Sequence, residues 1–133
     1  MDRNRMSSRV SVKKTDILKR LFLISVALLI VYLSHQPSLK PPFELFPHQD
    51  KLFHMVEFGG LGLALVVNAD LFGKKRRKYR MAYAGISWAV LDEIHQFFVP
   101  GRFCSFQDVL ADTAGLLLAL WLFSRLYSKN DGN

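Results

Sequence analysis

The fold is indicated most clearly by residues 106–127, FQDVLADTAGLLLALWLFSRLY, where a long apolar run follows two carboxylates. Leu116–Phe123 is apolar on nearly every face, whereas a helix in a soluble bundle keeps a polar side. A helix of this length extends about 30 Å at 1.5 Å rise per residue, which matches the hydrocarbon core of a bilayer. Residues 106–127 are therefore predicted to form a transmembrane helix.

Three further apolar runs, at 17–33, 52–72 and 81–99, predict three more helices in a chain of 133 residues. The first run resembles a signal peptide, but no small-residue cleavage site follows it, so we expect it to be retained. The proline-rich segment 34–49 cannot form a regular helix. We expect an all-α fold, an integral membrane four-helix bundle, with a basic tail at 1–16, the helical domain at 17–128 and a short tail at 129–133.

The basic residues are distributed unevenly and predict the topology. Net charge is +7, but only Lys40, Lys51 and Arg102 lie outside the segments that flank one side of the predicted membrane. This is the positive-inside pattern, and with four spans it places both termini in the cytoplasm. The same distribution argues against a nucleic-acid partner, although the basic segment 74–80 could also touch anionic lipid headgroups. Cys104 is the single cysteine, so no intrachain disulfide can form.

Polar residues recur at one depth near the outer ends of three predicted helices. Asp50, His54 and Glu57 share a face at i, i+4 and i+7. Asp92 lies seven residues before Val99, so it is about 10 Å below the outer end of its helix. A charge that deep costs at least ~2.5–3.5 kcal/mol, so intramembrane acids are usually functional. The three stretches therefore predict one buried polar site near the extracytoplasmic surface, formed by 50–57, 92–96 and 105–112.

Simpler interpretations of these residues remain open. Asp108 would cap the fourth helix, in a capping box with Ser105, and Asp50 would be an interfacial charge beside Lys51. His95 would be an interfacial histidine, and the whole cluster would be a hydrogen-bonding contact between helices. Small residues predict close helix contacts in lipid: Gly59, Gly60 and Gly62 on the second helix, and Ala111, Ala114 and Gly115 on the fourth. Short connections make the second, third and fourth helices antiparallel neighbours.

Clustered carboxylates with a histidine and an arginine suit phosphate chemistry with a divalent cation. Carboxylate oxygens favour Mg²⁺ or another divalent ion, and a guanidinium offers a bidentate fork to phosphate. Histidine can transfer protons or attack as a nucleophile. The predicted catalytic residues are His54, Asp92, Glu93 and Arg102. The predicted substrate-binding residues are Lys51, Gln96, Arg102 and Ser105, and the predicted metal ligands are Asp50, Asp92, Glu93, Asp108 and Asp112.

The assembled pattern resembles the VanZ-like family of small bacterial membrane proteins, named for a teicoplanin-resistance protein. The resemblance covers 50–115 and rests on Asp50–Lys51–x–x–His54 and on Asp92–Glu93–x–x–Gln96 through Pro100–Gly101–Arg102 to Asp112–x–x–Gly115. Phe58 stands where an aromatic, often Tyr, is usual, and Asp112 stands where Asn is common, which favours a role that accepts a cation. The resemblance implies a multi-pass protein of the bacterial cytoplasmic membrane, linked to glycopeptide susceptibility.

Three functions fit these residues. The first is hydrolysis or transfer of a phosphate group on a membrane lipid or polyprenyl carrier. The second is a non-enzymatic binding or immunity protein for lipid-linked cell-wall intermediates or lipoglycopeptide antibiotics. The third is a small ion- or proton-coupled transporter, although the chain shows no inverted repeat. A homodimer is left open.

Overall fold

The computed structural model describes residues 13–37 and 47–130, with side chains through residue 126. This part of the chain is helical and has no strand. The prediction of an all-α protein with four long helices is confirmed. The elements in chain order are α1 (Lys14–His35), α2 (Gln49–Val67), the short 3₁₀ helix η1 (Ala69–Phe72), α3 (Arg77–Phe97) and α4 (Phe106–Asn130).

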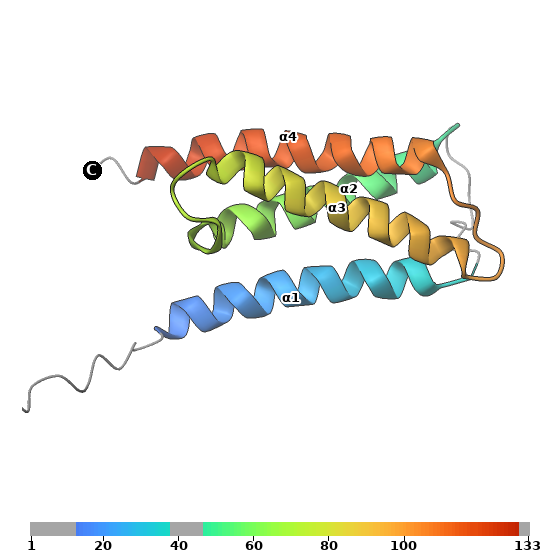
Figure 1. Ribbon diagram of the computed structural model, residues 1–133, viewed down its shortest axis with the longest axis horizontal. Coiled ribbons are helices and arrows are strands. Elements are labelled where there is room, and N and C mark those ends of the chain that lie inside the picture. The colour runs from blue at the N-terminus through green and yellow to red at the C-terminus, as the bar shows by residue number, and fades with distance from the viewer. Residues whose placement is uncertain (1–12, 38–46, 131–133) are drawn as a thin grey trace, which may run out of the picture.

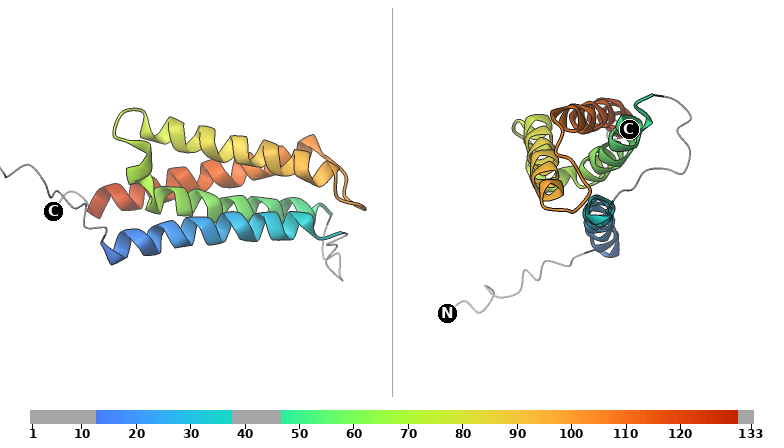
Figure 2. Two further views of the ribbon diagram at one scale, coloured as in Figure 1. Left: turned by 60° about the horizontal axis from the view of Figure 1, so that its bottom comes forward. Right: turned by 90° about the vertical axis from the view of Figure 1, so that its right-hand side faces the viewer.

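The four helices run roughly side by side, with α2, α3 and α4 grouped together and α1 lying along α2 and α3 (Figures 1 and 2). The start of α1, η1 and the end of α4 lie at one end, which we call the basic end. The end of α1, the start of α2 and the α3–α4 connection lie at the other, which we call the carboxylate end. Both ends of the helical domain are thus on the same side of the bundle.

The helix bounds differ from the apolar runs at several ends. The run at 52–72 does not form one helix, because α2 stops at Val67 and η1 follows. Asn68 is fully buried and donates its side-chain Nδ2 to the carbonyls of Ala64, at 2.9 Å, and Lys19, at 2.8 Å. At the starts of α2 and α3, the apolar run covers only the hydrophobic part of the helix, and the first polar residues of the helix precede it. Thus α2 and α3 begin earlier than predicted, at Gln49 and Arg77.

The most extensive contact between helices joins α2 and α4, which run in the same direction. An added Cβ on Gly62 would lie 2.9 Å from the Leu116 carbonyl oxygen, and one on Gly115 would overlap the backbone of Met55. The predicted close contact is therefore confirmed at Gly62 and Gly115. Gly60 faces open space. As predicted, α3 lies antiparallel to both helices, but the parallel pair contributes the larger interface.

The hydrophobic core lies between α2, α3 and α4, with one deeply buried contribution from α1. Phe58, Leu116 and Met81 are at most 1% exposed, and Ile30 of α1 joins them. Outside this core the helices expose many large apolar side chains, and Leu28 of α1 is 63% exposed. Among the described residues, two helices are long and apolar enough to cross a membrane: α1 and the Phe106–Leu126 part of α4.

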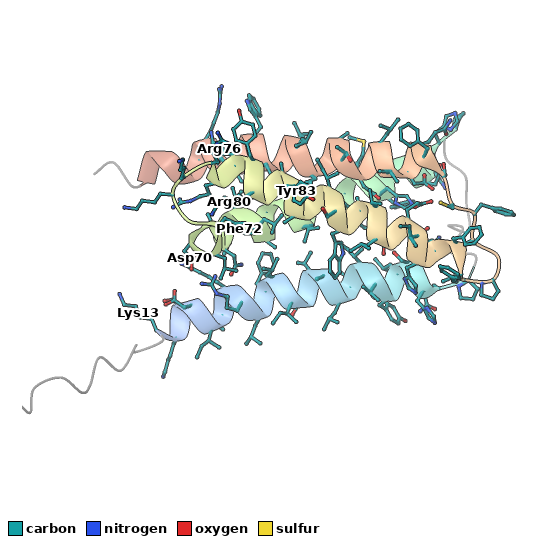
Figure 3. All side chains as sticks on the ribbon, viewed as in Figure 1. Lys13, Asp70, Phe72, Arg76, Arg80 and Tyr83 are labelled. Atoms are coloured by element: carbon teal, nitrogen blue, oxygen red, sulfur yellow. The ribbon has the colours of Figure 1, made fainter. Side chains whose placement is uncertain are left out.

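A polar contact fixes α1 at the basic end. Arg20 donates to the side-chain oxygen of Asn68 at 2.5 Å and forms an ion pair with Asp70. Figure 3 shows Asp70 on the turn next to the start of α1. The hydrogen bond from Arg20 holds the pKa of the Asp70 carboxyl below its ordinary value. This contact attaches a helix that otherwise buries little of its surface.

The α2–α4 contact predicts opposite effects for two glycines on these helices. Gly115→Ala forces the Met55 backbone away, and such overpacking typically costs about 1–3 kcal/mol. Gly60→Ala meets no atom within 4 Å, so it should be neutral or stabilising by up to about 1 kcal/mol through helix propensity. Thermal unfolding of the two purified variants in detergent measures both. Equal melting temperatures would contradict the close α2–α4 contact.

Candidate functional site

One group of charged residues lies between α2 and α4 at the carboxylate end. His54 Nδ1 lies 2.9 Å from Asp112 Oδ1, and Lys51 pairs with Asp108 and, at 2.8 Å, with Asp50. Lys51 and His54 are three residues apart on α2, and their partners are four residues apart on α4. Both helices therefore present one polar face to the other, as the spacing predicted.

The hydrogen bond between His54 and Asp112 defines the chemistry available to the imidazole. A carboxylate accepts only, so Nδ1 carries the proton and donates it. Nε2 then keeps its lone pair in the neutral ring. Its nearest carboxylate oxygen, on Asp108, is 3.9 Å away, which is too far for a hydrogen bond. The ring is thus oriented by one carboxylate and has a nitrogen left for proton transfer.

A second group joins α3 to α1. Oδ2 of Asp92 accepts hydrogen bonds from Ser34 Oγ at 2.6 Å and from Gln96 Nε2 at 2.9 Å. All three side chains are at most 5% exposed. Asp92 and Gln96 share a face of α3, as predicted, and Ser34 reaches them from the last turn of α1. Sequence reasoning missed Ser34, although its depth near the outer end of the first run was a usable signal.

Glu93 connects α3 to the start of α4. Its Oε1 accepts a hydrogen bond from the backbone N–H of Ser105. In a capping box the side chain three residues later, here Asp108, would accept that N–H. The predicted Ser105–Asp108 box is therefore wrong, because Glu93 takes the donor and Asp108 turns to Lys51 instead.

Four buried polar atoms at this end have no hydrogen-bond partner among the described residues. They are Asp92 Oδ1, Glu93 Oε2, Asp112 Oδ2 and Arg102 Nε. Asp112 is fully buried, and Asp92 and Glu93 are at most 5% exposed. An unpaired buried polar group typically costs about 1–3 kcal/mol. Such atoms occur together where a ligand, a proton or water completes the site.

Electrostatic interactions join the groups into one cluster. Asp112 interacts with both Asp92 and Glu93, and Glu57 interacts with Asp92 and Arg102. We call Lys51, His54, Glu57, Asp92, Glu93, Arg102, Asp108 and Asp112 the carboxylate cluster. It contains five carboxylates against Lys51, Arg102 and the titratable His54, so acceptors outnumber donors.

Asp50 and His95 lie at the margin of this cluster, and Arg102 belongs to it through the α3–α4 connection. The Asp50 side chain is 58% exposed and forms an ion pair with Lys51. His95 stacks on His35 of α1, with ring centroids 5.4 Å apart, and so contacts a neighbouring helix. Arg102 is half-buried in the α3–α4 connection, where its backbone N–H bonds to the Val99 carbonyl.

The predicted metal ligands do not converge on one point. Within 13–37 and 47–130, no group of three or more His, Cys, Asp or Glu side chains is arranged to hold a metal ion. Asp108 and Asp112 face α2, whereas Asp92 and Glu93 are engaged by Ser34, Gln96 and Ser105. The donor set of the five carboxylates is therefore spread over three helix contacts.

One protein family matches the chain over most of its length. Residues 6–127 match the VanZ/LLP1 family. The chain belongs to the VanZ/LLP1 family. The match includes all the residues of the carboxylate cluster, and it confirms the resemblance drawn from 50–115. No curated protein and no solved structure matches this VanZ-like chain.

A double-mutant cycle tests the main contact of the cluster. His54→Gln and Asp112→Asn should each destabilise the protein, and together they should show a coupling of about 0.5–3 kcal/mol, as expected for side chains in contact. Asp70→Asn provides the control, because Asp70 lies at the basic end, where it pairs with Arg20. Its effect should add to that of His54→Gln within about 0.5 kcal/mol. Additivity in both pairs would contradict the His54–Asp112 contact.

Proposed function

We propose that this VanZ-like protein spans the bacterial cytoplasmic membrane four times, with its carboxylate end near the extracytoplasmic surface. There it would hydrolyse or transfer a phosphate group on a membrane lipid or polyprenyl carrier. The observation that carries the chemical part is the His54–Asp112 hydrogen bond beside unpaired, buried carboxylate oxygens. The membrane part rests on separate observations.

Exposed apolar surface supports membrane insertion. Soluble monomers rarely expose apolar patches larger than a few hundred Å². Here α1 presents a series of exposed apolar residues along its length, including Ile24 at 53% and Leu29 at 54%. Lipid would cover this surface. The basic end carries six cations in the connection before α3 and in the first turn of α3, which favours the cytoplasmic side for that end. They are Lys74, Lys75, Arg76, Arg77, Lys78 and Arg80.

The single cysteine tests this topology. Cys104 is exposed in the α3–α4 connection at the carboxylate end. Loss of hydration and the nearby charge of Glu93 raise the pKa of its thiol, so labelling with a membrane-impermeant maleimide is run at about pH 8.5. Intact cells should be labelled at Cys104. A Cys104→Ser, Lys75→Cys variant should be labelled only after permeabilisation, and the reverse pattern would overturn the orientation.

In the proposed hydrolysis, Arg102 would contact the phosphate oxygens, as would Lys51 if it left Asp108. His54 Nε2 would take a proton from the attacking water. The new P–O bond forms as the P–O bond to the lipid hydroxyl breaks. Glu93, whose Oε2 has no partner, is placed to return a proton to the leaving oxygen. Gln96 and Ser105 position the neighbouring carboxylates.

The proposed hydrolysis does not require a divalent cation, and its dependence on metal is left to experiment. Asp50, Asp92, Glu93, Asp108 and Asp112 are chemically suitable oxygen ligands. Their separation over three helix contacts does not fit a single ion in this structure. The proposed steps therefore run through protein side chains alone.

A second function is favoured by the excess of acceptors in the cluster. Phosphate adds negative charge to five carboxylates, whereas a headgroup rich in hydroxyl, amide or ammonium donors would satisfy their unpaired oxygens directly. On this proposal the protein binds a lipid-linked cell-wall intermediate or a lipoglycopeptide without chemistry. It would then act as an immunity protein.

Turnover by the purified protein separates the two functions. Phosphate release is measured in nanodiscs over phospholipids and polyprenyl phosphates, with Mg²⁺, with Mn²⁺ and with EDTA. His54→Ala should lower the rate by about 10²–10⁴-fold, as for loss of an acid–base group. His95→Ala is the matched control, because His95 lies at the same end but stacks on His35, and it should retain activity.

The outcomes are distinct. Release that is lost in His54→Ala and kept in His95→Ala supports the phosphatase. Loss in EDTA would restore the metal to the mechanism. If the folded protein releases no phosphate but binds a donor-rich lipid saturably, the phosphatase is wrong and the binding function replaces it.

A further inference from the structure

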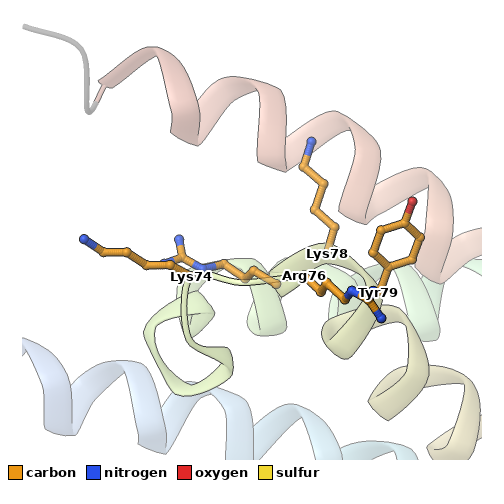
Figure 4. Close-up of a pocket in the computed structure, with 5 residues that line it drawn as sticks. Lys74, Arg76, Lys78 and Tyr79 are labelled. Carbon is orange, nitrogen blue, oxygen red and sulfur yellow. The ribbon is translucent and has the colours of Figure 1, made fainter.

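The basic end contains a cavity that the carboxylate cluster does not explain. It is a shallow depression that is wide open to the surface, with a volume of about 600 Å³, and it is lined by Lys74, Arg76, Arg77, Lys78 and Tyr79 (Figure 4). Four of its five lining residues are cations, and they come from one short stretch at the start of α3. Figure 4 shows Lys78 and Tyr79 extending on the side of α4, with Lys74 and Arg76 along the connection.

The positive charge of this cavity is not neutralised by the protein. Within the described residues the side chains of Lys74, Arg76 and Lys78 have no hydrogen-bond or ion-pair partner, whereas the Arg76 carbonyl accepts the Arg80 N–H. Arg77 and Arg80 are fixed instead by carbonyls of the connection, at Gly73 (2.9 Å) and Phe72 (3.2 Å). The nearest carboxylate in sequence, Asp70, is taken by Arg20. Like charges held together in this way favour an anionic ligand.

The backbone adds donors on the same side. Arg76 precedes α3 in a left-handed conformation, with φ 55°, and makes no side-chain cap. The N–H groups of Lys78 and Tyr79, in the first turn of α3, have no acceptor among the described residues. Such free N–H groups, together with the positive end of the helix dipole, attract phosphate groups.

Two tyrosines distinguish a lipid headgroup from a free anion. Tyr79 and Tyr83 are one turn apart on α3 and are 78% and 77% exposed. Figure 3 shows Tyr83 on α3, farther along the helix than Arg76 and Arg80. Tyrosine is enriched at the headgroup level of membranes, with the ring toward the acyl chains. The two rings lie between the cationic residues and the apolar part of α3. This arrangement suits a ligand that has a phosphate and attached acyl chains.

We propose that this cavity binds the phosphodiester headgroup of an anionic phospholipid in the cytoplasmic leaflet. Lys74, Arg76 and Lys78 contact the phosphate, and Tyr79 and Tyr83 line the acyl chains nearest the glycerol. The site is independent of the chemistry at the carboxylate end and requires only membrane insertion. It would fix the depth of α3 in the membrane.

The test is native mass spectrometry of the full-length protein in detergent, titrated with phosphatidylglycerol and, separately, phosphatidylcholine. Each cation near a lipid surface contributes about fivefold in affinity. The Lys74→Gln, Arg76→Gln, Lys78→Gln variant should therefore lose phosphatidylglycerol affinity on the order of 100-fold. The matched control removes the same charge from exposed positions elsewhere at the basic end, through Lys13→Gln, Lys14→Gln and Arg125→Gln, and should lower the affinity much less because these side chains do not line the depression.

A single variant protects the test against misfolding. Arg76→Gly removes the guanidinium, and glycine adopts positive φ without strain, so the fold should be kept. Its phosphatidylglycerol affinity should fall about fivefold. Equal losses in the triple variant and its control would overturn the cavity site, as would equal binding of phosphatidylcholine. Displacement of phosphatidylglycerol by millimolar inorganic phosphate would assign the cavity to a soluble anion instead.

Discussion

The close approach of α2 and α4 is the constraint on which the rest of the structure depends. Gly115 has no side chain where the Met55 backbone passes, and any larger residue would push the helices apart. Because two parallel helices in contact keep their register, this one approach sets which residues face each other at the carboxylate end. His54 is adjacent to Met55 and Asp112 is one turn before Gly115, so the two side chains meet. A small residue thus sets the position of the hydrogen bond between His54 and Asp112.

Burial of carboxylates then accounts for the position of α1. Carboxylates in an apolar interior are costly unless they are hydrogen-bonded. Asp92 lies at the contact of α3 with α1, where Ser34 and Gln96 supply its two donors. At the opposite end Asn68 and Asp70 bind Arg20. The least buried helix is therefore held by polar contacts at both ends, and its long middle part offers mainly apolar surface.

Much of this arrangement was accessible from the sequence. Four apolar runs gave the four helices, and the equal depth of Asp92, Asp108 and His54 predicted that they approach one another, because depth follows directly from residue count. The hydrogen-bond partners of these residues could not be predicted from the sequence. Glu93 and Asp108 are both possible acceptors for the Ser105 N–H, and Glu93 accepts it. The path of the α3–α4 connection decides between the two acids. Asn68 was missed because a single polar residue in an apolar run has no periodic pattern. Ser34 was missed because it was assigned to the connection 34–49, whereas α1 continues to His35.

The negative charge of the carboxylate cluster limits which ligands its geometry can accept. His54 between Asp108 and Asp112 is oriented as a proton acceptor, which favours hydrolysis, yet the surrounding carboxylates repel the phosphate that hydrolysis requires. A phosphate can approach only if Lys51 and Arg102 turn toward it or if protons reside on some of the acids. Lys51 is already paired with Asp50 and Asp108, whereas Arg102 Nε has no partner. Arg102 is therefore the group through which the cluster would first distinguish an anionic headgroup from a donor-rich one.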